Sequence, residues 1–429
     1  MKILISEKLE KKVQELAKEK YDYKFSIDTA ILLLNQLCYG TNNKDSIDES
    51  GFVSLCSEIL IKTIGKNYNK YLELFEVNSI IDKINYCTDC NTCNKFRIRD
   101  NWIEDNEVIE FEITNWSCLK KIKNNNIIMV SVTKKYHHLW KWFNSDKFKL
   151  NSKTALKELK SLGLSREKFN VNQNSIFKFT NNQKWFTMNN KSDKRLHNNL
   201  TNMKSEIRKH LIYDGEKLIN IDISNSQLYM LLHLLNIISK SSDENSTTYI
   251  ILEHYSVPLC NKEIERFQNL VLNGTFYIEL GQKLIKEKGK NGVYEVRKYS
   301  KKYKSMISEH QDDPKKLMKG ITFGVLFSNN KSQSPEKKWF KKEFPTIMNL
   351  IEEIKKEDHT KLALLLQNIE AHAVLDIATK NIHKYDKSIP MFTIHDSIMT
   401  IKKHVGTVKR IFEESLLEMT GFTPKLKID

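Results

Sequence analysis

Helical spacing of apolar residues dominates the chain, and short β-branched strand patterns interrupt it. Near the N-terminus, Leu9 and Val13 belong to an apolar stripe that predicts an amphipathic helix within residues 1–25. The polar, turn-rich stretch 42–50 follows and predicts a linker. We therefore expect residues 1–50 to form an N-terminal helical segment and a linker.

The next region predicts two helices followed by a hairpin. Helical patterns cover residues 54–64 and 66–78, then one strand ends at Tyr86 and a second covers 95–99. This order is typical of a winged helix-turn-helix, so we expect such a domain over residues 51–119. A helical packing domain without nucleic-acid contact is the alternative. The cations expected to meet nucleic acid are Lys66 and Lys70 on the second helix and Lys95, Arg97 and Arg99 on the wing.

Cysteines cluster at the tip of the predicted wing. Cys87, Cys90 and Cys93 follow one another with two residues between them, and Cys118 comes later. Thiolates at this spacing suit a zinc site, whose fourth ligand would be Cys118 or one of His137 and His138. Free thiols on a hairpin are the alternative.

Composition and charge narrow the class of protein. The 429 residues carry 69 Lys and Arg against 53 Asp and Glu, a formal net charge of +16. Such an excess favours a polyanionic partner such as nucleic acid, although an AT-rich genome would also give this composition. Without an apolar run of about 18 residues or a signal peptide, and with only seven cysteines, we expect a cytoplasmic protein with no membrane contact.

The candidate chemistry lies in the C-terminal half. Residues 217–223 predict a buried strand with Asp222 at its end, and residues 390–401 predict a hairpin with Asp396 at its turn. Two aspartates on adjacent strands of one sheet can bridge two Mg²⁺ ions for phosphoryl transfer. Taken alone, Asp222 has a simpler interpretation as a helix cap.

A helix over residues 315–328 lies between these strands in the sequence. Two cations and two aromatic residues recur at four-residue steps, which place them on one slanting stripe of a helix. They are Lys315, Lys319, Phe323 and Phe327. The stripe suits a nucleoside triphosphate, because lysines bind phosphates and phenylalanines stack on sugar and base. An ordinary amphipathic helix with solvated lysines is the alternative.

In this order the three segments resemble motifs A, B and C of the family A polymerases and the related single-subunit phage RNA polymerases. The resemblance covers about residues 190–429. It implies an α+β right-hand polymerase, in which an antiparallel palm sheet carries helical fingers and a thumb. Palm and fingers would occupy residues 201–429, and the basic helical region 120–200 would supply the thumb or a connector.

The resemblance also implies roles for individual residues. Asp222 and Asp396 would be the catalytic metal ligands for two Mg²⁺ ions, with the Ile223 carbonyl as a further ligand. The nucleotide would be bound by Lys315, Lys319, Phe323, Phe327 and Gln227. The primer-template would be approached by Arg195, Gln367 and His395.

Departures from the family pattern leave the nucleotide open. Gln227 replaces the glutamate that excludes the 2′-hydroxyl in family A DNA polymerases, and Phe327-Ser328 replaces Tyr-Gly. The missing phenol at Phe327 favours dNTPs. About 190 residues precede the palm, too few for the usual proofreading exonuclease, and this compact layout resembles phage, plasmid or mobile-element polymerases.

We therefore expect a monomeric, template-directed DNA polymerase that uses a DNA primer-template, or an RNA template, and nucleoside triphosphates. One alternative is a single-subunit RNA polymerase or a primase-like polymerase. Another is a DNA-binding replication regulator with an inactive palm.

Overall fold

The computed structural model describes residues 1–40, 47–48, 50–85, 93–103, 107–125, 129–189, 192–240, 261–300, 305–332 and 334–429. These residues form two compact units of mixed α and β structure. Unit 1 comprises Met1–His137, Phe143–Thr187 and His197–Lys217, and unit 2 comprises His138–Trp142, Met188–Leu196 and Leu218–Asp429. In the described part of the chain, no helix combines the length and the apolar character that crossing a membrane requires.

Unit 1 begins with a strand where the sequence pattern predicts a helix. Strand β1 (Lys2–Ser6) pairs antiparallel with β5 (Val108–Glu112), and helix α1 begins only at Glu7 and ends at Leu16. The side chains from Ile3 to Ile5 are all buried, because helices α2 (Ile27–Tyr39) and α9 (Arg166–Thr180) both pack against the strand. A fully buried strand shows no alternation of polar and apolar residues, which explains the error.

The predicted helices and hairpin of the N-terminal region are present. After α2 follow β2 (Val53–Ser54), α3 (Ser57–Thr63), α4 (Tyr68–Val77), β3 (Ile81–Ile84) and β4 (Lys95–Ile98), and the strands lie in the order β2-β4-β3. One hydrophobic core joins them to β1, α1 and α2, so these N-terminal elements pack with the helices and the hairpin. Element order alone does not establish a winged helix, and that assignment stays a prediction.

The remainder of unit 1 is mainly helical. Strand β9 (Leu211–Tyr213) pairs with β6 (Phe148–Leu150) and with the first residues of β10 (Glu216–Ile223), through which the chain passes into unit 2. The other elements along this part of the chain are η1 (Asp100–Trp102), α5 (Trp116–Asn125), α6 (Val130–Lys135), α8 (Ser152–Ser161), β7 (Phe186–Met188), β8 (Leu196–Asn198) and α10 (Ser205–Arg208).

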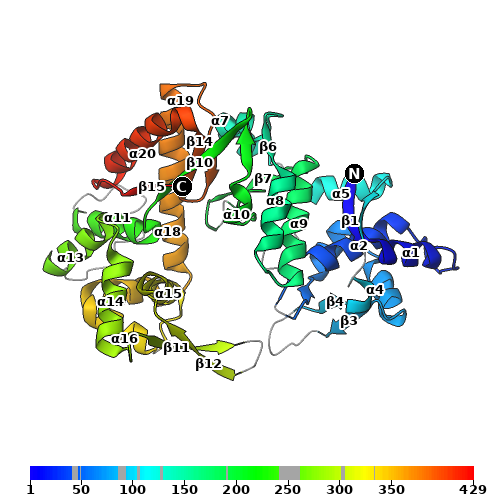
Figure 1. Cartoon of the computed structure of the whole chain (residues 1–429), viewed down its shortest axis with the longest axis horizontal. Helices are drawn as coiled ribbons and strands as arrows, with labels where there is room; N and C mark the ends of the chain where they lie inside the picture. Colours follow the sequence, from blue (N-terminus) through cyan, green and yellow to red (C-terminus); the bar gives the residue numbers. More distant parts are fainter. Residues whose placement is uncertain are drawn as a thin grey trace. The chain divides into compact units, whose positions relative to one another are not determined.

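Unit 2 is built around an antiparallel sheet in which β10 is central. Strand β14 (Ser397–Ile401) pairs with one side of β10, and β13 (Phe392–Ile394) pairs with β14. Strand β15 (Leu426–Ile428) pairs with the other side of β10, near the point marked C in Figure 1. The sheet therefore brings three segments that are distant in sequence to one place.

Helices make up most of the rest of unit 2. Helix α18 (Lys361–Ala371) packs against α11 (Ser226–Lys240) and α15 (Pro314–Phe327), and it continues through the π-helical segment η2 (His372–Ala378). The remaining elements of unit 2 are α7 (His137–Phe143), α13 (Asn261–Leu272), α14 (Phe276–Lys288), the hairpin β11 (Tyr294–Ser300) and β12 (Ser305–Gln311), α16 (Pro335–Glu343), α17 (Pro345–Ile354), α19 (Thr379–Tyr385), η3 (Lys402–His404) and α20 (Val405–Thr420).

A buried histidine predicts how acid affects unit 2. His138 is 7% exposed, and its Nε2 lies 2.9 Å from Thr379 Oγ1. Burial, with repulsion from His383 and two lysines, lowers its pKa to about 4. In the unfolded chain this imidazole takes up a proton with a pKa of about 6.5. Acid therefore favours the unfolded state, and the free energy of unfolding should fall by at most about 3 kcal/mol between pH 6.5 and 4.

The measurement is urea unfolding across this pH range. In His138→Gln the free energy of unfolding should decrease less with falling pH than in the wild type. His359 is exposed, so His359→Gln should retain the wild-type dependence on pH. Equal slopes in wild type and His138→Gln would contradict the assignment.

Candidate functional site

The two aspartates predicted to hold metal come together at one end of the unit 2 sheet. In the pairing of β10 with β14, Asp222 lies opposite Ser397, the residue directly after Asp396. The backbone N–H of Ile223 donates to the carbonyl oxygen of Asp396 over 3.2 Å. His395, at the same hairpin turn, has a left-handed φ of 50°. The sheet register thus brings together two carboxylates that are 174 residues apart in sequence.

Asp222 lies in an electrostatic environment that disfavours its ionised form. Partial burial, then repulsion from Asp396 and Asp429, raises its pKa to about 7, while Lys427 and Lys319 oppose the increase. A bound cation would relieve this repulsion between neighbouring carboxylates.

The donor set fits Mg²⁺, which prefers hard oxygen ligands and is commonly held by one or two carboxylates together with substrate phosphates and water. Within the described residues, no group of three or more His, Cys, Asp or Glu side chains is arranged to hold a metal. At this site Asp222 and Asp396 would supply two carboxylates, and substrate and water would complete the coordination.

Helix α15 carries the predicted stripe on its outer face. The Asp313 side chain accepts hydrogen bonds from the backbone N–H of Lys315 and Lys316, and Pro314 takes the first helical position, so the sequence fixes where the helix begins. The opposite face of the helix is buried and carries apolar residues such as Leu317 and Val325.

Three side chains of the stripe lie next to one another. Lys315, Lys319 and Phe323 are exposed and Phe327 is half-buried. Lys319 Nζ lies 5.7 Å from the centre of the Phe323 ring, and the rings of Phe323 and Phe327 lie 5.6 Å apart. Because the charge of Lys319 opposes the increase in the pKa of Asp222, Lys319 lies within electrostatic reach of that carboxylate.

A buried lysine that the sequence pattern did not single out holds the end of this helix. Lys355 is 2% exposed, and its Nζ donates to the carbonyl oxygens of Val325 and Leu326 over 2.7 and 3.3 Å. These carbonyls belong to the last turn of α15, where a cation satisfies unpaired acceptors and the helix dipole. Lys355 therefore fixes the position of the Phe327 end of the stripe.

The residues predicted to approach nucleotide and primer are joined by a carboxylate that sequence analysis missed. Glu370 is fully buried on α18, one turn after the half-buried Gln367. Arg195 donates to its Oε1 from Nε over 2.9 Å and from Nη2 over 2.5 Å. Gln227 donates from Nε2 to its Oε2 over 2.7 Å. Glu370 thus holds both side chains in one buried network.

The charge on Glu370 is coupled to the same site. Burial, then repulsion from Asp396, raises the pKa of Glu370 to about 7, although Arg195 and Gln227 oppose the increase. Gln227 is 9% exposed, and its Oε1 is buried without a hydrogen-bond partner among the described residues. The sequence could have indicated Glu370, because a single carboxylate on a largely apolar helix is rarely buried without a charged or hydrogen-bonding partner.

Acidic residues and ion pairs occupy the predicted nucleic-acid surface of unit 1. The Lys70 ammonium binds Asp22 over 2.5 Å and lies over the Tyr23 ring. The exposed positions of α4 include Glu73 and Glu76. Nucleic-acid contact through Lys70 would have to compete with this ion pair, and it stays a prediction.

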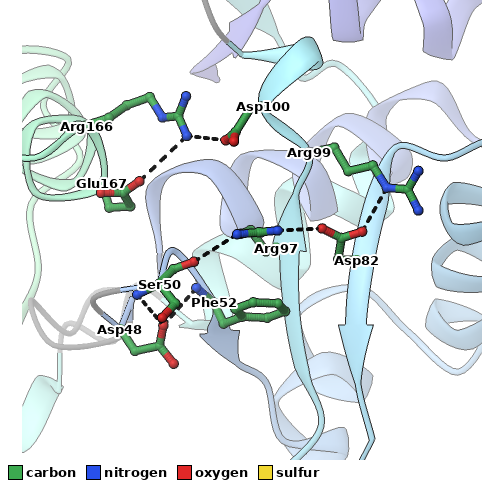
Figure 2. A network of polar contacts seen from close by, with 9 residues as sticks. All are labelled: Asp48, Ser50, Phe52, Asp82, Arg97, Arg99, Asp100, Arg166 and Glu167. Atoms are coloured by element: carbon green, nitrogen blue, oxygen red, sulfur yellow. Dashed lines mark hydrogen bonds and ion pairs between the residues drawn. The ribbon is translucent and has the colours of Figure 1, made fainter. Parts of the chain in front are cut away.

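The cations of the predicted wing are paired too, as Figure 2 shows for its two arginines. Asp82 accepts from Arg97 and from Arg99, each over 2.8 Å, and the hydrogen bond from Arg97 is the main cause that lowers the pKa of Asp82. Lys95 binds Asp48 over 2.9 Å. Nucleic-acid contact through this hairpin would have to compete with these pairs, and it stays a prediction.

The cysteines of the candidate zinc site have different environments. Cys118 is 2% exposed in the core of unit 1, and its Sγ lies 3.2 Å from Thr29 Oγ1. Cys93 is exposed, whereas Cys87 and Cys90 lie outside the described residues. Cys118 is a poor fourth ligand for a site on the hairpin because its thiol is in the core and already contacts Thr29, and His138 is a poor one because it is buried. The zinc site stays a prediction.

Comparison with known proteins gives little further information. No family model and no curated protein matches this sequence. Among solved structures, the chain is similar to the POL domain of Pol1 from M. smegmatis in complex with DNA primer-template and dNTP, with a TM-score of 0.39 and 10% identity. The alignment covers 65% of this chain and 55% of that chain, so this protein spans about half the length of its match. A similarity this low establishes neither a shared fold nor a shared activity.

Proposed function

We propose that this protein is a template-directed DNA polymerase of the family A type, which transfers nucleotides from dNTPs to a 3′-hydroxyl without a proofreading exonuclease. One observation carries the proposal. Asp222 and Asp396 meet at the end of the sheet, with the lysine and phenylalanine stripe of α15 within electrostatic reach. Nucleotidyl transfer needs this combination of metal-binding carboxylates, a phosphate-binding cation and an aromatic surface.

Each side chain would have a defined part in the reaction. Asp222, Asp396 and the Ile223 carbonyl would hold two Mg²⁺ ions, which bring the 3′-hydroxyl to the α-phosphate and offset the charge that develops on its oxygens. Lys319, assisted by Lys315, would neutralise the triphosphate. The remaining contacts would come from Phe323 and Phe327 on sugar and base, and from Gln367, His395 and Arg195 at the primer-template.

One observation favours a second candidate, a single-subunit RNA polymerase or primase-like polymerase. The amide of Gln227 is bound to Glu370 inside a buried network. A side chain held in this way is less available to block a ribose 2′-hydroxyl. The two candidates differ in the nucleotide that they accept.

Extension of a labelled primer tests both candidates. DNA and RNA templates are offered with Mg²⁺ and either dNTPs or rNTPs, with Asp396→Asn as the inactive control. Extension with dNTPs supports the proposal, and extension with rNTPs alone supports the second candidate. If wild type and Asp396→Asn are equally inactive, with and without a primer, the polymerase proposal fails.

Removing the central cation of the stripe should weaken nucleotide use. Lys319→Met is expected to lower kcat/KM for the nucleotide by about 10- to 100-fold, because the triphosphate loses a charged partner. Steady-state kinetics with varied nucleotide measures this. The matched control is Lys342→Met on α16, an exposed lysine outside the stripe, which should leave kcat/KM within about twofold. If Lys319→Met and the wild type had equal kcat/KM values, Lys319 would not bind the nucleotide.

A further inference from the structure

The strand nearest the C-terminus places a second pair of charges beside the candidate metal site. In the pairing of β10 with β15, Lys427 lies directly opposite Asp222. Asn220 and Asp429 exchange backbone hydrogen bonds in both directions, over 3.1 and 3.0 Å, which fixes this register. The position of Lys427 is therefore set by the sheet.

Sheet geometry determines which side chains share a face. Directly opposed residues of an antiparallel pair project from the same face, with Cβ atoms about 4.5–5.5 Å apart, and so do residues two apart along a strand. Asp222, Lys427 and Asp429 therefore lie on one face of the sheet. Asn220 shares this face, and its buried Oδ1 has no hydrogen-bond partner among the described residues.

The charges on this face act on Asp222 with opposite signs. The ammonium of Lys427 attracts the Asp222 carboxylate and the carboxylate of Asp429 repels it. The Lys427 ammonium also contacts Asp429, and the two side chains are 58% and 50% exposed. Lys427 thus offsets negative charge at the place where a divalent cation would do the same.

We propose that Lys427 is a built-in counter-ion that weakens divalent-cation binding at the aspartates when no nucleotide is bound, and that Asp429 moderates it. The inference rests on the proposed function, since it concerns the same metal site. A fixed positive charge on the same face repels an arriving divalent ion, whereas a triphosphate adds negative charge that outweighs it. Metal binding therefore becomes dependent on nucleotide.

The test measures metal binding without nucleic acid. Free Mn²⁺ is followed by electron paramagnetic resonance as it is titrated into the full chain, with Asp222→Asn defining the binding that belongs to the site. Lys427→Met should lower the Kd for Mn²⁺ by about three- to fivefold, because a repelling charge is removed. Asp429→Asn should raise the Kd by about two- to threefold, because it removes an attracting charge and releases Lys427 toward Asp222.

Matched variants separate this effect from general changes in charge or folding. Lys402→Met makes the same change of charge just beyond Ile401, which pairs with Leu218 at the other end of β10, and it should leave the Kd unchanged. Lys427→Arg keeps the charge and should also retain the wild-type Kd. Because Lys427 and Asp429 are half-exposed, 1 M KCl should largely remove the differences.

Two outcomes distinguish the inference from the proposed function. If wild type extends primers but Lys427→Met binds Mn²⁺ as the wild type does, the inference is wrong and the polymerase proposal stands. If Lys427→Met tightens Mn²⁺ binding but no variant extends a primer, the inference stands and the polymerase proposal fails. Absence of binding that depends on Asp222, at millimolar Mn²⁺, overturns the inference as well.

Discussion

Asp396→Asn and Asp222→Asn are each expected to reduce nucleotide incorporation by about a thousandfold or more, which corresponds to at least about 4 kcal/mol of transition-state stabilisation. The amide keeps the shape of the carboxylate but has no charge to hold a divalent cation. Because both aspartates serve one site, the double variant should be scarcely slower than either single variant. Single-turnover extension measures the chemical step, and Mn²⁺ titration measures the loss of metal binding.

The matched control is Asp358→Asn. Asp358 is exposed and precedes the first residue of α18, Lys361, whereas Glu370 lies near the other end of that helix. This variant should retain wild-type activity. A wild-type rate in Asp222→Asn would show that the strand-end carboxylate is not part of the reacting centre.

Glu370→Ala is expected to lower the free energy of unfolding of unit 2 by about 3–5 kcal/mol, because it leaves the largely buried guanidinium of Arg195 without its counter-charge. It also leaves the Gln227 amide without an acceptor. Glu370→Gln should lose only about 1–2 kcal/mol, since its carbonyl can still accept from Arg195 and the Gln227 amide can rotate. Urea unfolding followed by circular dichroism measures both.

Two further variants show whether the loss comes from the unpaired charge. Arg195→Met combined with Glu370→Ala should be more stable than Glu370→Ala alone, because no charge is left buried without a partner. Glu353→Ala, which removes a surface ion pair with Lys356, should change stability by no more than about 0.5 kcal/mol. Additive losses at Arg195 and Glu370 would contradict the coupling.

The role of Glu370 at the site can be separated from its role in stability. If Glu370 positions Gln227 and Arg195, Glu370→Gln at a temperature where it is fully folded should change the ratio of dNTP to rNTP incorporation and raise the KM for nucleotide. A purely structural residue would leave both unchanged in the folded fraction.

The sequence by itself determined the local elements that carry the candidate chemistry. The strand predicted over residues 217–223 is observed as Glu216–Ile223, and the helix predicted over 315–328 as Pro314–Phe327. Both elements could be predicted because the sequence patterns that define them are local. Helical spacing and the Asp313 cap define the helix, and a short β-branched run defines the strand. Asp222 and Asp396 were expected at strand ends of one sheet, and the register brings them together.

Tertiary structure alone decided which distant residues complete the site. Lys427 faces Asp222 because of a pairing between residues about 200 positions apart, and Glu370 acquires its partners from two other segments. Similarly, the apolar run at Lys2–Ser6 becomes a strand through its pairing with Val108–Glu112. Periodicity reports only how a segment distributes its own side chains. Strand register and buried ion pairs depend on contacts between segments, and the charge balance of the candidate site depends on them as well.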